Sequence, residues 1–434
     1  MKVRNWIVLV AIAAMLAACT QGSPEGDETT EGDSADGGDP IEVAAVFTGE
    51  EKRNFEAVLD AFSEESGVET TFTSAGDDMA AFLGNKIEGG SPPDVALIAQ
   101  PGLVRSLAGD GSLTPASEDV AAAMEENFAP VWSELGSVDG DLYGVYFKVS
   151  NKSTWWYHPP TFESAGVEPP ADWDEMLQSA ETVNSSGVPW VSMGGADGWT
   201  LTDWFENIYL RTAGPEMYDQ LSNHEIPWTD ESVIQALEVW AELVGDEANI
   251  AGGVEGALQT DFVTSVTQVF TGDPKAATVY EGDFVPGQIP ADTGAEAGTD
   301  YDFFDFPSID GSEPAVVGGG DAAVALTDNE SAQEFLAFLA TPEAAEVWAS
   351  AGGFTSANQN LDTGVYPDEI SQRSGEAVAS AEEVRFDMSD LQPPEFGGTS
   401  GRGLWLRFQD FVKNPDDAQT IAEALEKDAT KAFK

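Results

Sequence analysis

The residues of this 434-residue chain that could do chemistry point to binding more than to catalysis. Its only histidines are His158 and His224, so no histidine-rich metal site can form. The sequence has no G-x-S-x-G nucleophile elbow and no phosphate-binding P-loop, and Asp139-Gly140-Asp141 lacks the spacing of an EF-hand. Paired carboxylates of a glycosidase stay possible, because 78 acidic residues make such pairs unavoidable. We expect no metal, no cofactor and no enzymatic activity.

The single cysteine, Cys19, could do a different chemistry. Two basic residues, Lys2 and Arg4, precede an apolar run from Trp6 to Met15 that is too short to span a bilayer and is typical of a signal peptide. The segment LAAC at 16–19 matches the bacterial lipobox, in which the cysteine thiolate accepts a diacylglyceryl group. An ordinary secretory signal with a chance cysteine is the alternative. We predict a lipoprotein signal peptide at 1–19 and an extracytoplasmic protein held at the cell membrane by lipid alone.

Residues 20–39 carry seven acidic side chains, no basic one and no large apolar one. Such a segment cannot bury enough surface to fold, so we predict a disordered acidic tether there and a folded part from about Pro40. The whole chain has 18 basic and 78 acidic residues, a formal net charge of −60. Nucleic acid and anionic lipid surfaces would repel it and are not expected as partners. One interpretation of the acidity is adaptation to high salt.

Short apolar runs alternate with amphipathic segments in the first part of the folded chain. Strands are expected at 41–48, 68–73 and 94–99, and helices at 50–66 and 77–88. This alternation predicts an α/β fold with a parallel sheet, which binds ligands at the carboxyl ends of its strands. The loops at 48–50, 74–76 and 100–102 are therefore candidate binding loops.

From Thr161 onward the pattern is richer in helices. Trp155 and Trp156 alternate along a strand, so we expect one to face the core and the other to face the opposite layer. The sequence predicts helices at 174–184, 203–213, 232–243, 259–271, 331–340, 342–351, 403–412 and 416–433, and strands at 276–280, 301–306 and 315–324.

Six short segments spread over the chain share an order and spacing with one protein family. They are VDGDLYGV at 138–145, KVSNKSTWWY at 148–157, VEPPADWDEM at 167–176, WTLTDWF at 199–205, VGGGD at 317–321 and FLATPEAAEVWASAGGF within 335–354. Together they resemble the extracellular solute-binding proteins of ABC importers, family 1, the maltose-binding-like branch. Within it the chain is most similar to binders of α-glucosides and other sugars.

The resemblance implies an α/β, two-lobed, periplasmic-binding-protein-like (type II) fold with a hinge and a ligand cleft between the lobes. The first lobe would be 40–150 plus 316–365, and the second 151–315 plus 366–434. The chain would cross between them near 148–151 and 315–319. The glycines Gly318 to Gly320 suit a hinge or a close ligand approach, and a glycine bulge in a strand is the simpler alternative.

A sugar presents apolar C–H faces ringed by hydroxyl groups, so its site needs aromatic platforms and planar hydrogen-bonding side chains. In the family, the second lobe supplies such contacts from two regions. The resemblance carries these roles to Trp199, Asp203, Trp204, Tyr280, Glu281 and Asp283. At the last three positions the chain departs from the residues usual in the family, which leaves the identity of the ligand open.

Positions near the expected crossings and in loops add more candidates. These are Gln100, Asn151, Lys152, Gly320, Asp321 and Arg402. Each candidate also has a simpler structural role. Tryptophans pack in cores, Asp321 could cap a turn, Lys152 could balance nearby carboxylates, and Gln100 and Arg402 could be solvated.

We interpret the chain as the substrate-binding lipoprotein of an ABC importer. It would be a monomer that closes over a mono- or oligosaccharide, an α-glucoside among the candidates, and delivers it to permease subunits driven by a cytoplasmic ATPase. One alternative is a surface carbohydrate-active enzyme. Another is the same fold binding a non-sugar solute such as a peptide, a polyamine or an anion, of which the acidity disfavours the anion.

Overall fold

The computed structural model describes residues 38–76, 78–380 and 383–434. The predicted signal peptide, Cys19 and most of the predicted tether lie outside these residues. The first strand begins at Ile41, next to the predicted start of the folded part. Within the described residues, no helix combines the length and the apolar character needed to cross a membrane.

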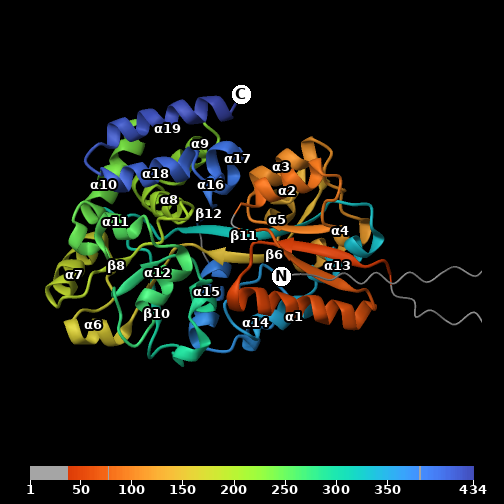
Figure 1. The fold of residues 1–434 in the computed structure, drawn as a ribbon, viewed down its shortest axis with the longest axis horizontal. Coiled ribbons are helices and arrows are strands. Elements are labelled where there is room, and N and C mark those ends of the chain that lie inside the picture. The colour runs from red at the N-terminus through yellow and green to blue at the C-terminus, as the bar shows by residue number, and fades with distance from the viewer. Residues whose placement is uncertain (1–37, 77, 381–382) are drawn as a thin grey trace, which may run out of the picture. The chain divides into compact units, whose positions relative to one another are not determined.

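Two sheets organise the described residues (Figure 1). The larger one has the order β12-β11-β3-β1-β2, with β6 paired to β11. Its strands are β1 (Ile41–Ala45), β2 (Thr70–Ser74), β3 (Val95–Ile98), β6 (Gly144–Asn151), β11 (Val316–Ala325) and β12 (Val384–Phe386).

The first three strands are parallel, as predicted, but the sheet as a whole is mixed. Strand β11 runs antiparallel to β3 and to β6. The prediction of a parallel sheet is therefore confirmed for β1, β2 and β3 and does not extend to β11 and β6, because β11 returns from the second sheet and does not follow a helical crossover.

Helix α1 (Gly49–Ser66) shows how the sequence pattern builds this layer. Phe55, Val58, Leu59 and Phe62 recur at helical spacing and are buried, and Gly67 ends the helix in the left-handed conformation at φ 78°. The other elements here are α2 (Met79–Glu88), α3 (Pro101–Gly109), α4 (Glu118–Asn127), α5 (Pro130–Leu135), α13 (Glu330–Leu339), α14 (Pro342–Ala349) and the hairpin of β4 (Ser137–Val138) and β5 (Asp141–Leu142).

The second sheet has the order β10-β7-β9-β8. Its strands are β7 (Thr154–Tyr157), β8 (Val191–Ser192), β9 (Thr278–Tyr280) and β10 (Asp302–Asp305). Trp155 and Trp156 are both buried and belong to different hydrophobic clusters, which confirms that they face opposite layers.

Helices surround this sheet. The helix predicted at 259–271 begins later, at Phe262, because the Asp261 carboxylate caps it by accepting the Thr264 N–H. The helices are α6 (Pro159–Ala165), α7 (Trp173–Ser185), α8 (Thr200–Ala213), α9 (Pro215–Ser222), α10 (Glu231–Val244), α11 (Gly253–Ala257), α12 (Phe262–Val269), α15 (Glu369–Ser380), α16 (Met388–Leu391), α17 (Pro394–Gly397), α18 (Gly403–Lys413) and α19 (Ala418–Ala432), with short 3₁₀ turns η1 (Glu247–Asn249), η2 (Val285–Gln288), η3 (Ala291–Thr293) and η4 (Thr363–Val365).

The chain passes between the sheets at short connections. It leaves β6 after Asn151 and enters β7 at Thr154, so Lys152 and Ser153 lie between the sheets. The C-terminal helices pack in the hydrophobic cluster of the second sheet, whereas β12 pairs with β11 of the larger one. The proposed lobe boundaries stay a prediction.

Candidate ligand-binding site

A cavity of about 430 Å³ is lined by elements of both sheets. From the larger sheet come Thr48 and Gln100, just past the carboxyl ends of β1 and β3, and Asp321 on β11. From the second come Trp199, next to α8, and Phe284, past β9. Two of the three loops proposed from the sequence thus reach the cavity, and the loop at 74–76 does not line it.

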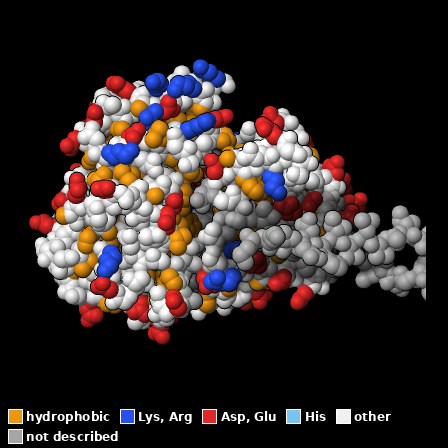
Figure 2. All heavy atoms as spheres, viewed as in Figure 1, with side chains coloured by type: hydrophobic (Ala, Val, Ile, Leu, Met, Phe, Trp, Pro, Cys, Tyr) orange, Lys and Arg blue, Asp and Glu red, His pale blue; other side chains and the backbone are white. Residues whose placement is uncertain are grey.

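Five aromatic rings lie on the wall of this pocket. Three of them form a cluster, with ring centroids 5.2 Å apart for Trp199 and Phe262, and 5.5 Å apart for Phe262 and Phe284. Figure 2 shows hydrophobic side chains gathered in a band down the middle of one face of the molecule. The complete aromatic set is Phe47, Trp199, Phe262, Phe284 and Trp405.

Lys148 is one of two lysines on the wall. Its Nζ lies 2.6 Å from Glu51 Oε1 and 3.8 Å from Asp321 Oδ2. The same ammonium group lies over the Phe47 ring at 5.4 Å and the Phe284 ring at 5.3 Å. Burial by itself would lower the pKa of Lys148, but Glu51 and Asp321 outweigh it and raise that pKa.

Lys152 is the second wall lysine. Its Nζ donates to Asp387 Oδ2 and to Asp203 Oδ1 at 3.3 Å, and lies 3.7 Å from Asp390 Oδ2. Burial opposes its charge, but these three carboxylates hold the pKa of Lys152 well above its usual value. Space for this side chain comes from Gly319, because a Cβ there would lie 2.8 Å from Lys152 Cε. The close approach of the lysine side chain, and not a positive φ, explains why a glycine stands at this position.

Behind Lys152 the structure buries more carboxyl groups than the lysine can neutralise. Burial raises the pKa of Asp203, Glu206 and Asp390 well above its usual range, and that of Glu281 to about 8. Asp387 differs, because its contact with Lys152 and the donors of its helix cap overcome burial and hold its pKa at about 2. The region is thus rich in carboxyl groups whose charged form is disfavoured by burial.

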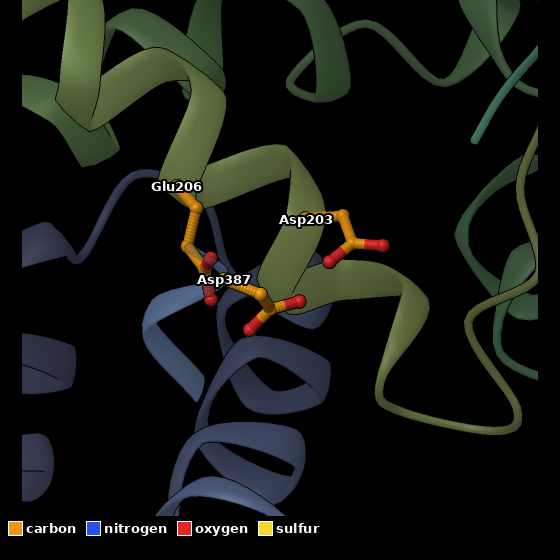
Figure 3. A group of neighbouring side chains, drawn as sticks. All are labelled: Asp203, Glu206 and Asp387. Atoms are coloured by element: carbon orange, nitrogen blue, oxygen red, sulfur yellow. The ribbon is translucent and has the colours of Figure 1, made fainter. Parts of the chain in front are cut away.

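Asp203, Glu206 and Asp387 offer oxygens within 4.8 Å of one another, a spacing that a cation could bridge (Figure 3). Asp203 and Glu206 extend from α8 toward Asp387 at the start of α16. Glu206 accepts from the Met388 and Ser389 N–H groups and the Tyr218 hydroxyl, and Asp387 accepts from Lys152. These donors already hold Glu206 and Asp387, and Asp203 Oδ1 accepts from Lys152, so we interpret the group as a hydrogen-bonded network and not as a metal centre.

The structure brings five of the twelve proposed ligand contacts to the pocket wall. They are Gln100, Lys152, Trp199, Gly320 and Asp321.

Six others lie behind the wall, in the core. The Tyr280 hydroxyl donates to Lys152 O at 2.7 Å, and Asp283 accepts from Thr355 Oγ1 at 2.6 Å. Trp204 packs against Trp155 and Trp240, which is the core role that is common for tryptophan. The complete set is Asn151, Asp203, Trp204, Tyr280, Glu281 and Asp283, all buried.

Arg402 lies away from this pocket. It precedes α18 and lines a separate surface cavity with Arg407 and Lys431. Trp405, which the sequence did not single out, is the α18 residue that reaches the pocket. Figure 2 shows basic side chains gathered over α19, near this end of the fold.

Sequence reasoning missed most of the polar wall. Lys148 had a signal, because basic residues are scarce and it lies in the KVSNKSTWWY segment. No sequence signal marked Glu51, Asp387 and Asp390, because nothing distinguishes them from the other acidic residues among the 78 in the chain.

Comparison with known proteins agrees with this architecture. The chain matches the bacterial extracellular solute-binding protein family over residues 48–346. The osmoprotective compounds-binding protein GgtB of Synechocystis sp. is 33% identical, over 97% of this chain and 98% of that protein. The alpha-glucosides-binding periplasmic protein AglE of Rhizobium meliloti is also 33% identical, over 89% of this chain and 86% of that protein.

Solved structures share the fold. The bacterial solute receptor AcbH superposes with a TM-score of 0.81 at 22% identity, over 92% of this chain and all of that one. The GacH receptor of Streptomyces glaucescens gives 0.74 at 16% identity, over 91% of this chain and 98% of that one. These likenesses confirm the α/β, two-lobed type II periplasmic-binding-protein fold. Since the family match covers more than half of the sequence and both relatives align over most of their length, this chain belongs to the bacterial extracellular solute-binding proteins.

Proposed function

We propose that this protein captures a neutral, polyhydroxylated solute of the α-glucoside class and delivers it to the permease of an ABC importer. One observation carries the proposal: a single cavity places aromatic rings beside carboxylate and lysine groups from both sheets. The volume of about 430 Å³ falls within the roughly 300–1,000 Å³ of small-molecule sites. The relative AglE binds alpha-glucosides, which supports the class.

The chemistry follows from the wall. The rings of Trp199 and Phe284 would cover the apolar C–H faces of a sugar, and Asp321 and Gln100 would hydrogen-bond its hydroxyl groups. Lys148 and Lys152 would donate to ring or hydroxyl oxygens. A solute that touches both lobes stabilises the closed arrangement by its differential affinity, with the lobes bounded as 40–150 plus 316–365 and 151–315 plus 366–434.

A thermal-shift screen tests the proposal. Maltose, trehalose, galactose and glucuronate would be compared on the purified folded part. An α-glucoside at about 100 times its Kd is expected to stabilise the protein by about 2.7 kcal/mol through mass action. Stabilisation by none of the sugars, but by a peptide or a polyamine, would contradict it. Release of a cleaved product from labelled oligosaccharides would favour the enzyme alternative.

A second candidate is an osmoprotective solute outside the glucosides. The relative GgtB binds osmoprotective compounds, and a net charge of −60 suits a saline medium, in which screening weakens self-repulsion. Adding glycine betaine to the same screen separates the two candidates.

The compartment is part of the proposal. Acylation of Cys19 would hold the protein at the outer face of the cell membrane, where a monomer could meet the permease and its cytoplasmic ATPase. Replacing Cys19 by serine is expected to release the protein from the membrane fraction. An unchanged distribution would contradict the lipid anchor.

A further inference from the structure

The C-terminal end of the chain differs in charge from the rest of the protein. Residues 402–434 carry six basic and six acidic side chains, so their formal charges cancel. Since the chain has 18 basic and 78 acidic residues, the other 12 and 72 lie within 1–401 and account for the whole net charge of −60. Figure 2 shows basic side chains gathered over α19 at this end of the fold. The self-repulsion of the acidic body is therefore relieved locally on the surface of α18 and α19.

Four basic side chains of this end form one group, which we call the basic ridge: Arg402, Arg407, Lys427 and Lys431. Three of them, Arg402, Arg407 and Lys431, line a surface cavity of about 490 Å³ that is separate from the ligand pocket. Lys427 precedes Lys431 by four residues on α19, and residues four apart lie on the same side of a helix. The ridge thus runs from the start of α18 along α19.

Two cations of the ridge are paired within the fold. Asp428 lies 2.8 Å from Arg407 Nη2 and 3.0 Å from Lys431 Nζ, so one carboxylate serves both. Asp410 adds a contact with Arg407 at 3.2 Å. The side chain of Lys431 is still 59% exposed. Solvent-exposed pairs contribute little free energy, so these cations can also turn toward the carboxylates of a partner at small cost.

Arg402 is an unpaired cation on a fixed backbone. Neither Arg402 nor Lys427 has a side-chain hydrogen bond or an ion pair within the described part of the chain, and both are exposed. Gly401 and Gly403, on either side of the arginine, take positive φ values of 72° and 46°. A Cβ at Gly403 would collide with Phe396 O, so this loop packs closely against α17. The guanidinium group is therefore presented to solvent from a preorganised loop, which lowers the entropy cost of binding.

The charges around the ridge decide which kind of anion it can hold. A membrane or a nucleic acid is an extended polyanion and would also meet the strongly acidic body. A short acidic loop of a protein interacts only with charges within one Debye length, about 8 Å at physiological salt. Its carboxylates also match the two-donor geometry of arginine. These arguments favour a protein partner.

We propose that the basic ridge is a docking surface for an acidic loop of a protein partner. Arg402 would clamp one carboxylate in the cavity, and Lys427 and Lys431 would hold others along α19. The loop that carries Arg402 also lines the ligand pocket, through Gly398 on one side and Trp405 on the other. A partner on the ridge would therefore contact the segment that meets the solute. Identifying this partner with the permease rests on the proposed function.

Fluorescence anisotropy with a labelled octapeptide of alternating aspartate and glutamate tests the surface at physiological salt. We expect the peptide to bind the wild type in spite of its net charge of −60. The triple variant Arg402→Gln, Lys427→Gln, Lys431→Gln removes three exposed charge contacts. It is expected to bind the peptide about tenfold more weakly, and to bind the sugar as the wild type does because these residues lie outside the ligand pocket.

A second triple variant, Arg53→Gln, Lys86→Gln, Lys275→Gln, is the matched control. It removes the same number of arginines and lysines from solvent-accessible ion pairs elsewhere on the surface. Its net charge therefore equals that of the ridge variant, and it is expected to keep the wild-type affinity for the peptide. An equal loss in both variants would show a nonspecific charge effect and overturn the docking surface.

Other results would also overturn it. Displacement of the peptide by inorganic phosphate would assign the cavity to a small anion, and ridge-dependent sedimentation with phosphatidylglycerol vesicles would assign the ridge to a lipid surface. Normal sugar binding without peptide binding would reject the docking surface alone. A wild type that holds the peptide through the ridge but binds no solute would refute the proposed function and leave the docking surface standing.

Discussion

Lys148 Nζ lies 2.6 Å from Glu51 Oε1, which joins strand β6 to the first turn of α1 at the pocket wall. The lysine side chain is 5% exposed, so this is a buried ion pair. Asp321, at 3.8 Å from the same Nζ, depends on the same cation. The positive charge of Lys148 therefore stabilises two carboxylates on the pocket wall that come from different parts of the chain.

Replacing Lys148 by methionine should damage both stability and binding. The change leaves the partly buried Glu51 and the buried Asp321 without this cation, and breaking a buried pair from one side costs roughly 3–5 kcal/mol. Urea denaturation measures the loss of unfolding free energy. Lys275→Met, at an exposed pair, is the control and should change little. Equal effects of the two substitutions would speak against the role of Lys148.

Gly319→Ala should weaken ligand binding more than it weakens the fold. The new Cβ would meet Lys152 Cε at 2.8 Å, and the flexible lysine would move off the wall. We expect about tenfold weaker binding, roughly 1.4 kcal/mol. Gly318→Ala is the matched control, because its Cβ meets nothing closer than 3.5 Å. Calorimetric titration of both variants checks this, and equal affinities would contradict it.

Trp199→Ala and Trp240→Phe should separate binding from folding. Trp199 lies on the pocket wall, so its loss should cost about 0.5–1.5 kcal/mol of binding free energy beyond the lost area. Trp240 is fully buried against Trp204, so its replacement should lower the melting temperature and leave affinity near the wild-type value. Unchanged affinity in Trp199→Ala together with weaker binding in Trp240→Phe would show that the ligand does not bind in this pocket.

Stability should fall as the pH rises through the range set by Glu281. Its pKa is about 4.5 in an unfolded chain and about 8 in the fold, so between these values the folded chain holds a proton that the unfolded chain has released. The unfolding free energy thus declines from about pH 4.5 to about pH 8 and levels off above. Because other acids titrate too, the quantity to measure is the unfolding free energy of the wild type minus that of Glu281→Gln, which should fall as the pH rises from about 4.5 to about 8.

Salt should raise the melting temperature. With a net charge of −60, self-repulsion opposes the compact state, and molar salt shortens the Debye length to about 3 Å. Scans between low and molar sodium chloride check this. A melting temperature that stays constant would count against adaptation to a saline medium.

Local sequence patterns predicted much of the fold. The spacing of Phe55, Val58, Leu59 and Phe62 with Gly67 behind them defines α1, and the alternation of short strands and helices gives the parallel core of the larger sheet. The six family-like segments indicated the family, which the match over residues 48–346 confirmed. These signals are local because helical periodicity, caps and strand alternation depend on neighbouring residues.

The sequence predicted only part of the ligand-binding site. Gln100, Lys152, Trp199, Gly320 and Asp321 do reach the pocket. Local patterns did not predict that β11 runs antiparallel to β3 and β6. The direction of a strand depends on the end of the sheet at which the chain enters it, and only the tertiary structure sets that.

The sequence by itself determined the family, the charge and the kinds of side chain available for binding. Only the tertiary structure decided which of the 78 acids face the pocket and which are buried behind it. Asp203 is adjacent to Glu281 in space and 78 residues away in sequence, and their coupling exists only because packing excludes water from both. No local sequence pattern encodes burial, yet burial is what shifts the pKa values of these carboxyl groups away from their ordinary range.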